Sequence, residues 1–280
     1  AGSRNETYET QGITHLLRIA AGLTTSRAST FGITRNIQQM GGSLVATSDR
    51  ESIAYTLQAT RDKLDKALSF LEDVATRQVF KPWEISDSTP RLRYELSTIP
   101  ENVRIIDLLH KAAYREGLGY SLYSPKRQLD KISSETLQHF VNTWHTGARC
   151  AVVASGIPLN EISAMAGSLN LGSGNGNTTP AKFGGGEVRK ERNSELASVA
   201  VAVESSGLDK EKDALAFAVL QQAAGTGPHV KWGNTTAPLH RAVGSAAGND
   251  PFAITAFNAS YTDSGLFGFL LQAPASVAGA

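Results

Sequence analysis

The stretch that decides the fold is GITHLLRIAA, residues 12–21 of the 280-residue chain. Leu16, Leu17 and Ile19 fall on one side of an α-helix at this spacing, so the stretch by itself predicts an amphipathic helix. On that interpretation His15 is an ordinary polar residue near the start of the helix. The alternative is that His15 belongs to a functional site.

The sequence of this helix resembles a zinc-binding motif in which the residues needed for metal binding have been replaced. Zinc peptidases of the H-x-x-E-H class bind the metal with two histidines one helical turn apart, and the intervening glutamate is the general base. At those places this chain has His15, Arg18 and Ile19. Isoleucine has no lone pair for a metal, and a permanently charged guanidinium is no base and repels a dication. We therefore expect no metal site and no catalytic residue here.

Residues 12–25 resemble the zinc-motif region of the pitrilysin-type metallopeptidases, the family of the mitochondrial processing peptidase. The likeness continues in NIQQMGGSLVA, residues 36–46, and in SDRE, residues 48–51. The resemblance implies an α+β fold of duplicated domains similar to those of the processing peptidase. Each would have a mixed or antiparallel sheet with helices packed on one face.

A carboxylate far downstream extends this resemblance. In the family a glutamate within a sequence like LREMQ completes the zinc site. Glu95, within RYEL, stands 76 positions after residue 19, which matches the family spacing. The resemblance implies that His15 and Glu95 survive from a zinc site in which Arg18 and Ile19 have replaced the other two residues.

Longer runs resemble the core-protein branch of the family, whose members are non-catalytic subunits of mitochondrial ubiquinol–cytochrome c reductase, respiratory complex III. The resemblance covers essentially the whole chain, although core proteins are much longer. We therefore expect a fragment truncated at both ends that lacks the family's first strand. The runs that carry the likeness are THLLR (14–18), STF (29–31), GTGPHVK (225–231) and FNASYTDSGLFG (257–268).

The resemblance also implies a location and partners. It implies a structural and assembly role on the matrix side of the mitochondrial inner membrane, as a peripheral protein. The implied partners are core protein 1, cytochrome b, cytochrome c1 and the Rieske protein, with the Rieske presequence as a further ligand. Haems and the iron–sulfur cluster would lie in those partners, and this subunit would hold no cofactor.

Two other functions remain open on the sequence. The first is a presequence-binding alpha-type subunit of a processing peptidase, in which Gly225, Gly227, His229 and Lys231 would form a presequence-contact loop. The structural alternative for that loop is an ordinary surface connection. The second is a self-sufficient zinc peptidase, which would need the residues that the motif lacks.

Composition narrows the function classes. A net charge of +1 gives no overall electrostatic case for nucleic acid, and no apolar run approaches the ~18 residues that a membrane span needs. The single cysteine, Cys150, excludes an internal disulfide framework and is typical of a reducing compartment. It lies in the apolar run CAVVA, which predicts a buried strand with a structural thiol.

A stretch rich in glycine and asparagine divides the chain and predicts two domains. Residues 1–171 form the first, the Gly/Asn-rich stretch 172–183 is a linker, and residues 184–280 form part of the second. A weak repeat at an offset of 214 residues aligns Asp49 with Asp263 and Tyr55 with Phe269, each within a strand, a polar turn and a strand. Helices are predicted around His15 and over 30–40, 61–76, from 82, and over 102–114, 133–144, 159–169 and 210–224, with strands within 43–59 and 196–204.

Overall fold

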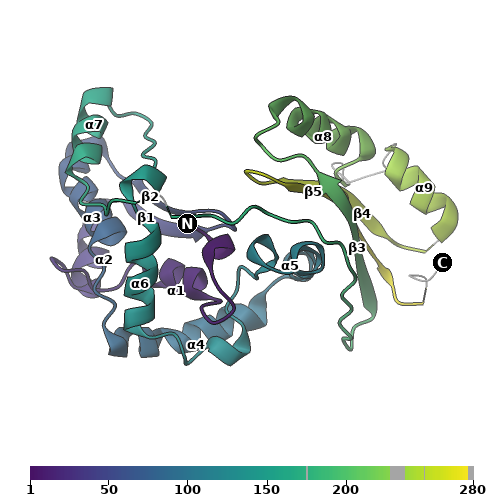
Figure 1. The fold of residues 1–280 in the computed structure, drawn as a ribbon, viewed down its shortest axis with the longest axis horizontal. Coiled ribbons are helices and arrows are strands. Elements are labelled where there is room, and N and C mark those ends of the chain that lie inside the picture. The colour runs from purple at the N-terminus through teal and green to yellow at the C-terminus, as the bar shows by residue number, and fades with distance from the viewer. Residues whose placement is uncertain (175, 228–236, 249, 277–280) are drawn as a thin grey trace. The chain divides into compact units, whose positions relative to one another are not determined.

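The computed structural model describes residues 1–174, 176–227, 237–248 and 250–276. The chain forms two compact units (Figure 1). The first contains Ala1–Thr98 and Tyr120–Thr178, and the second contains Ile99–Gly119 and Thr179–Ala280. The division thus falls near residue 179, and an early helical segment groups with the later strands. The domain boundaries at 171 and 184 stay predictions.

The first unit consists of helices around one β-hairpin. Ser29 caps α2 by accepting a hydrogen bond from the Gly32 amide over 3.2 Å, and Ser133 caps α6 in the same way. Short 3-10 helices lie at Ser3–Asn5, Arg61–Lys63, Lys126–Gln128 and Gly147–Arg149. The longer elements are α1 (Ile13–Ala20), α2 (Thr30–Gln39), β1 (Ser43–Ser48), β2 (Ile53–Gln58), α3 (Leu64–Thr76), α4 (Pro82–Thr98), α6 (Ser134–Trp144) and α7 (Leu159–Ser168).

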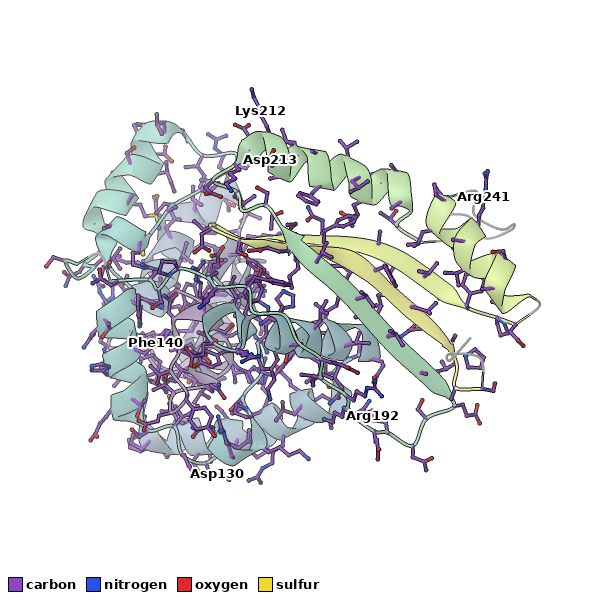
Figure 2. All side chains as sticks on the ribbon, turned by 45° about the vertical axis from the view of Figure 1, so that its right-hand side comes forward. Asp130, Phe140, Arg192, Lys212, Asp213 and Arg241 are labelled. Carbon is purple, nitrogen blue, oxygen red and sulfur yellow. The ribbon has the colours of Figure 1, made fainter. Side chains whose placement is uncertain are left out.

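The helix predicted from residues 12–21 is confirmed as α1, and it is the centre of the first core. Leu16, Leu17 and Ile19 are buried, together with Leu137 and Phe140 on α6; Phe140 is labelled in Figure 2. Burial of such side chains contributes about 1.5–3 kcal/mol each to stability. A second cluster packs α2 and α3 against the hairpin. The apolar side chains of α1 therefore fix this helix in the core of the first unit.

The second unit is a three-stranded antiparallel sheet in the order β3-β5-β4. Leu266 of β5 clusters with Tyr114, whereas the next residue, Phe267, contacts the Phe217 ring at 5.6 Å. Because successive strand residues point to opposite faces, α5 covers one face of the sheet and α8 the other. The elements are α5 (Glu101–Tyr114), Gly117–Gly119 (3-10), β3 (Leu196–Ser205), α8 (Glu211–Ala224), α9 (Pro238–Ala247), β4 (Ala253–Ser260) and β5 (Gly265–Pro274).

A buried polar contact joins α5 to the β4–β5 turn. The His110 ring donates from Nδ1 to the Ile106 carbonyl over 2.7 Å, so Nε2 accepts from the Tyr261 hydroxyl at 2.6 Å. Tyr114 reaches Ser264 in the same turn at 3.0 Å. On the other face, Lys212 and Asp213 of α8 point away from the sheet (Figure 2). These contacts explain why α5 groups with strands far along the chain.

The two predicted copies of a strand, a polar turn and a strand are antiparallel hairpins, β1–β2 and β4–β5, but the pairs that flank their turns, Ser48–Ile53 and Ser260–Gly265, give an offset of 212 residues and not 214. Their surroundings differ. β5 pairs with β4 on one edge and β3 on the other, whereas β2 has only β1 as a neighbour among the described residues.

The prediction of a buried strand at Cys150 is wrong. Cys150 is exposed, residues 150–154 form no strand, and the Val153 side chain is 92% exposed. A strand needs a neighbouring backbone to pair with, and this segment lies across a cavity from β2 instead of beside it. The apolar composition of CAVVA gave the propensity for a strand, but the described residues supply no partner.

Candidate functional site

The site on α1 begins with the way that helix is anchored. Glu6 is 5% exposed, and its carboxylate accepts hydrogen bonds from the backbone amides of Gly12 and Thr14, both at 2.9 Å, and from the Thr14 hydroxyl at 2.6 Å. The first amides of a helix have no partner within it, so Glu6 acts as a side-chain cap. Burial raises the pKa of Glu6 to about 7, against the hydrogen bonds from Thr14 and Gly12, which lower it.

Replacing Glu6 with alanine will destabilise the first unit by about 1–3 kcal/mol, because buried amides of Gly12 and Thr14 lose their acceptor. Urea titrations of the wild type and the variant measure this difference. Glu9→Ala is the matched control, since the Glu9 side chain is exposed and should change stability by less than about 0.5 kcal/mol. Equal losses in the two variants would rule out the capping role.

His15 and Arg18 of α1 converge on Glu95 of α4. His15 Nε2 lies 3.0 Å from Glu95 Oε2, and Arg18 donates to the same oxygen. Arg91, one turn before Glu95 on α4, donates to the other carboxylate oxygen over 3.3 Å. The Glu95 side chain is 22% exposed and that of Arg18 24%, whereas His15 is fully buried. The structure thus brings together three of the four predicted zinc-site positions.

The fourth position, Ile19, belongs to the apolar core. It is 5% exposed and packs in the cluster that contains Leu16 and Leu137. At this place the helix therefore contributes packing and no metal ligand.

The proton on His15 is fixed by a contact that the sequence does not reveal. The backbone N–H of Ser124 donates to His15 Nδ1 over 3.1 Å, so Nδ1 carries no hydrogen. The hydrogen of the neutral ring is therefore on Nε2 and is donated to Glu95. Burial lowers the pKa of His15, and Arg18 adds to the effect, although Glu95 opposes it. The ring is held neutral and in one orientation.

The charge on Glu95 is maintained by its donors. Burial acts to raise its pKa, but the hydrogen bonds from His15 and Arg18 and the guanidinium charge outweigh that effect and lower the pKa to about 2. Arg18 thus supplies the positive charge that compensates this carboxylate. The arrangement is a charge-assisted hydrogen-bond cluster that joins α1 to α4, with no group in it able to take up a proton near neutral pH.

The cluster makes stability depend on pH in the acid range. Burial lowers the pKa of His15 below its ordinary value of 6.5, and it lowers the pKa of His145, a histidine outside the cluster, to about 4. Both rings therefore favour the folded state in their neutral form. Their contribution to the free energy of unfolding is complete above pH 6.5 and declines below it. The pKa of Glu95 is lowered from 4.5 to about 2, so its carboxylate contributes stability that is lost as the pH falls between those two values. Glu6, whose pKa is raised from 4.5 to about 7, acts in the opposite direction between those values, so urea titrations should show the free energy of unfolding falling with pH most clearly below 4.5. In Glu95→Gln the decline between 4.5 and 2 should be shallower, and an unchanged slope would contradict the role of the carboxylate.

The predicted presequence-contact loop is only partly described. Gly225 ends α8 with φ 120°, and its carbonyl accepts from the Ala256 amide over 2.8 Å. Gly227 has φ 97° and lies beside Thr255 of β4. Both therefore have backbone conformations that favour glycine, next to the edge strand β4. His229 and Lys231 lie outside the described residues, so the loop stays a prediction.

Ser124 and Arg91 were missed by sequence reasoning. Arg91 stands four residues before Glu95 on one helix, a spacing that could have indicated the pair. A backbone amide such as that of Ser124 carries no sequence signal. Within the described ranges, no group of three or more His, Cys, Asp or Glu side chains is placed to hold a metal ion. The helices of those same ranges include none with the length and apolar character to cross a membrane.

Comparison with known proteins gives the family. Residues 1–126 match the family model described as insulinase (peptidase family M16), and residues 131–278 match that of the peptidase M16 inactive domain. The chain is 41% identical to cytochrome b-c1 complex subunit 2, mitochondrial, of Homo sapiens, and 40% identical to that of Rattus norvegicus; each match covers 100% of this chain and 62% of the relative. It is 29% identical to the probable mitochondrial-processing peptidase subunit alpha-1 of Arabidopsis thaliana, over 95% of this chain and 55% of the relative. The chain thus spans less than two thirds of the length of these relatives. Because the two M16 models match almost all of its length, this α+β chain belongs to peptidase family M16.

Proposed function

We propose that the chain is a non-catalytic structural and assembly subunit of mitochondrial respiratory complex III, of the core protein 2 type. The observation that carries the proposal is that Arg18 donates to Glu95, the carboxylate that a zinc peptidase would need as a metal ligand. The relatives with 41% and 40% identity, named as subunit 2 of the cytochrome b-c1 complex, support the choice of complex. The match of the second half to an inactive M16 domain supports a role without catalysis.

The residues present do not fit a catalytic zinc ion. Such a site uses three protein ligands and keeps a fourth position for water, and His15 and Glu95 provide two. Arg18 puts a fixed cation on the oxygen that would face the metal. A histidine that binds metal through Nε2 normally donates from Nδ1 to an acceptor, but here Nδ1 faces the N–H of Ser124. Too few ligands, the positive charge of Arg18 and the hydrogen bond to His15 Nδ1 all disfavour the binding of zinc.

The proposed setting is peripheral, on the matrix side of the inner membrane. There the chain would pair with core protein 1 and support cytochrome b, cytochrome c1 and the Rieske protein. These partners would hold the haems and the iron–sulfur cluster, while this subunit would bind no redox cofactor. The Rieske presequence is the further ligand that we assign to the pair of core proteins.

Native electrophoresis of detergent-solubilised mitochondria tests this function. We expect an epitope-tagged chain to migrate with cytochrome c1 and the Rieske protein. Migration with a soluble processing peptidase beta subunit, and absence from complex III, would overturn the proposal. That result would favour the alternative of a presequence-binding alpha-type subunit, to which the 29% identity with a processing peptidase alpha subunit gives some support.

A further inference from the structure

A groove beside the His15 cluster has two arginines in its lining. It has a volume of about 580 Å³ and is bounded by the end of α1, by α2 and by β1. Arg18 of α1 and Arg91 of α4 both line it, and among the described residues of the lining none is Asp or Glu. A ligand that enters this groove therefore meets positive charge.

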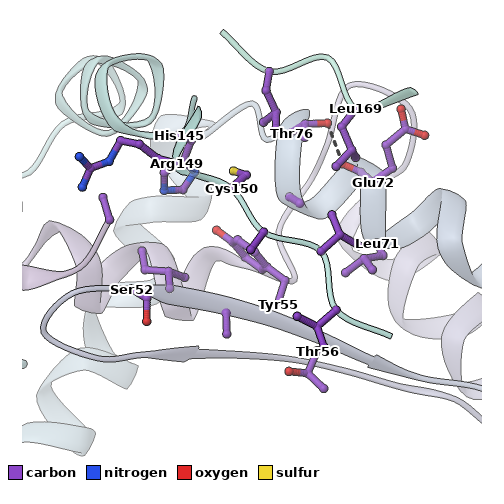
Figure 3. Close-up of a pocket in the computed structure, with 18 of the residues that line it drawn as sticks. Ser52, Tyr55, Thr56, Leu71, Glu72, Thr76, His145, Arg149, Cys150 and Leu169 are labelled. Carbon is purple, nitrogen blue, oxygen red and sulfur yellow. Dashed lines mark hydrogen bonds between the residues drawn. The ribbon is translucent and has the colours of Figure 1, made fainter. Parts of the chain in front are cut away.

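The groove beside β2 differs from it in charge. Its lining contains Glu72 and Arg149, both labelled in Figure 3, and also Glu51. Charges of both signs thus line the groove beside β2, whereas only cations line the groove beside the His15 cluster.

The positive charge at this groove exceeds what Glu95 compensates. Arg18 donates to Oε2 of this carboxylate and Arg91 to Oε1, while the His15 ring is neutral. Two guanidinium groups and one carboxylate give the cluster a net charge of +1. Because the Arg18 side chain is only 24% exposed, its charge is screened less by water than that of a free surface arginine.

Both guanidinium groups have further donors for a ligand. Each guanidinium has five N–H groups in a planar fork, and within the described ranges the hydrogen bonds of Arg18 and Arg91 go to Glu95 alone. Since both groups already reach one carboxylate, they lie close enough together for a second carboxylate to bridge them. Such charge-assisted hydrogen bonds are roughly twice as strong as neutral ones. An acidic ligand is therefore favoured over a neutral one of the same shape.

The rest of the groove has room for more than a carboxylate, and much of its wall is apolar. Ile33 and Ile37 of α2 line it together with Leu44 and Val45 of β1, and the Val45 side chain is 51% exposed. Apolar side chains placed here would remove this surface from water, which is favourable by about 25 cal/mol per Å². The two arginines and the apolar wall together fit an acidic residue that is flanked by apolar ones.

We propose that this groove binds a segment of a partner polypeptide that presents an aspartate or glutamate side chain to Arg18 and Arg91, with apolar side chains on either side. The carboxylate bridges the two guanidinium groups, and the flanking side chains contact Val45 and the isoleucines of α2. A presequence is not this partner, because mitochondrial presequences are rich in arginine and poor in acidic residues. The inference does not depend on which complex the chain joins.

Three short peptides test the requirement for a negative charge. Their sequences are AVEVA, AVQVA and AVKVA, each acetylated and amidated so that only the central side chain can carry a charge. Each peptide is titrated into the full chain, and NMR follows the Nε–H signals of Arg18 and Arg91. We expect AVEVA to shift both signals and AVQVA to bind about tenfold more weakly, because hydrogen bonds to charged groups are the stronger ones. AVKVA should shift neither signal.

A pair of variants ties the binding to this groove. Arg91→Gln should weaken the binding of AVEVA by about tenfold and remove most of its advantage over AVQVA. The matched control is Arg35→Gln, which removes an exposed arginine of α2 from outside the described lining and should leave binding unchanged. Circular dichroism checks that both variants fold, as expected for changes at exposed side chains.

Several results would overturn the proposal. They are equal binding of AVEVA and AVQVA, no shift of either arginine signal with AVEVA, and equal effects of the two variants. Displacement of AVEVA by acetate at the same concentration would also overturn it, because the ligand would then be a small anion and not a polypeptide.

Discussion

Zinc will bind the double variant Arg18→Glu, Ile19→His and will not bind the wild-type chain stoichiometrically. The substitutions restore a second histidine one turn from His15 and replace the guanidinium on Glu95 with a carboxylate. Together with Glu95 they complete the three-ligand set of an H-x-x-E-H site. Affinity should rise by more than about 100-fold, since even outer partners of a metal ligand change affinity by about 10–100-fold. Isothermal titration calorimetry with zinc measures this change in affinity.

The Ser124 amide opposes this gain without cancelling it. When zinc takes Nε2, the ring hydrogen moves to Nδ1 and faces the N–H of Ser124 at 3.1 Å. Leaving such a donor unsatisfied costs about 1–3 kcal/mol. Zinc at a four-ligand structural site contributes about 10–16 kcal/mol, which is about 2.5–4 kcal/mol per ligand. The gain of a ligand therefore exceeds the cost of the misdirected amide.

The control for this experiment adds Glu95→Ala to the double variant, which should lose most of the gained affinity. Circular dichroism must show that each variant is folded, because Ile19 is a core residue. A folded double variant that binds zinc no better than the wild type would contradict the interpretation of these positions as a degenerate zinc site.

Leu17→Ala will destabilise the first unit by about 2–5 kcal/mol. Leu17 is fully buried in the cluster that includes Phe80 and Phe140, and removing its side chain leaves a cavity in addition to the lost transfer free energy. Since whole domains are stable by about 5–15 kcal/mol, this is a large fraction of the total. Urea titration followed by circular dichroism gives the value.

The matched control is Phe31→Ala on α2. This aromatic side chain is 72% exposed, so its removal should change stability by less than about 0.5 kcal/mol. If Phe31→Ala were as damaging as Leu17→Ala, the core assigned around α1 would be wrong.

Helices and strands whose apolar residues recur at a regular spacing could be predicted from the sequence. Residues around His15 alternate apolar and polar at helical spacing, and they form α1. Both hairpins follow from polar turns between apolar runs. Cys150–Ala154 have the composition of a strand, but a strand also needs a partner, which no local pattern can report. The grouping of α5 with the later strands likewise depends on distant contacts, such as that between His110 and Tyr261.

The candidate site divides in the same way. His15, Arg18 and Glu95 were found because a motif fixes their spacing, and the structure places their side chains together. The Glu6 cap and the Ser124 amide were not found. The carboxylate of Glu6 lies six residues before Gly12, whose amide donates to it. The Ser124 donor is a backbone N–H, which any residue would supply. Their effects come from the three-dimensional path of the chain, which no single stretch of sequence specifies.

The central claim is that Arg18, and not a metal ion, compensates the charge of Glu95. The most direct test is metal analysis of the purified wild-type chain after dialysis against zinc, in parallel with Glu95→Ala. We predict far less than one zinc per chain in both proteins. Stoichiometric zinc in the wild type that is lost in Glu95→Ala would contradict the account.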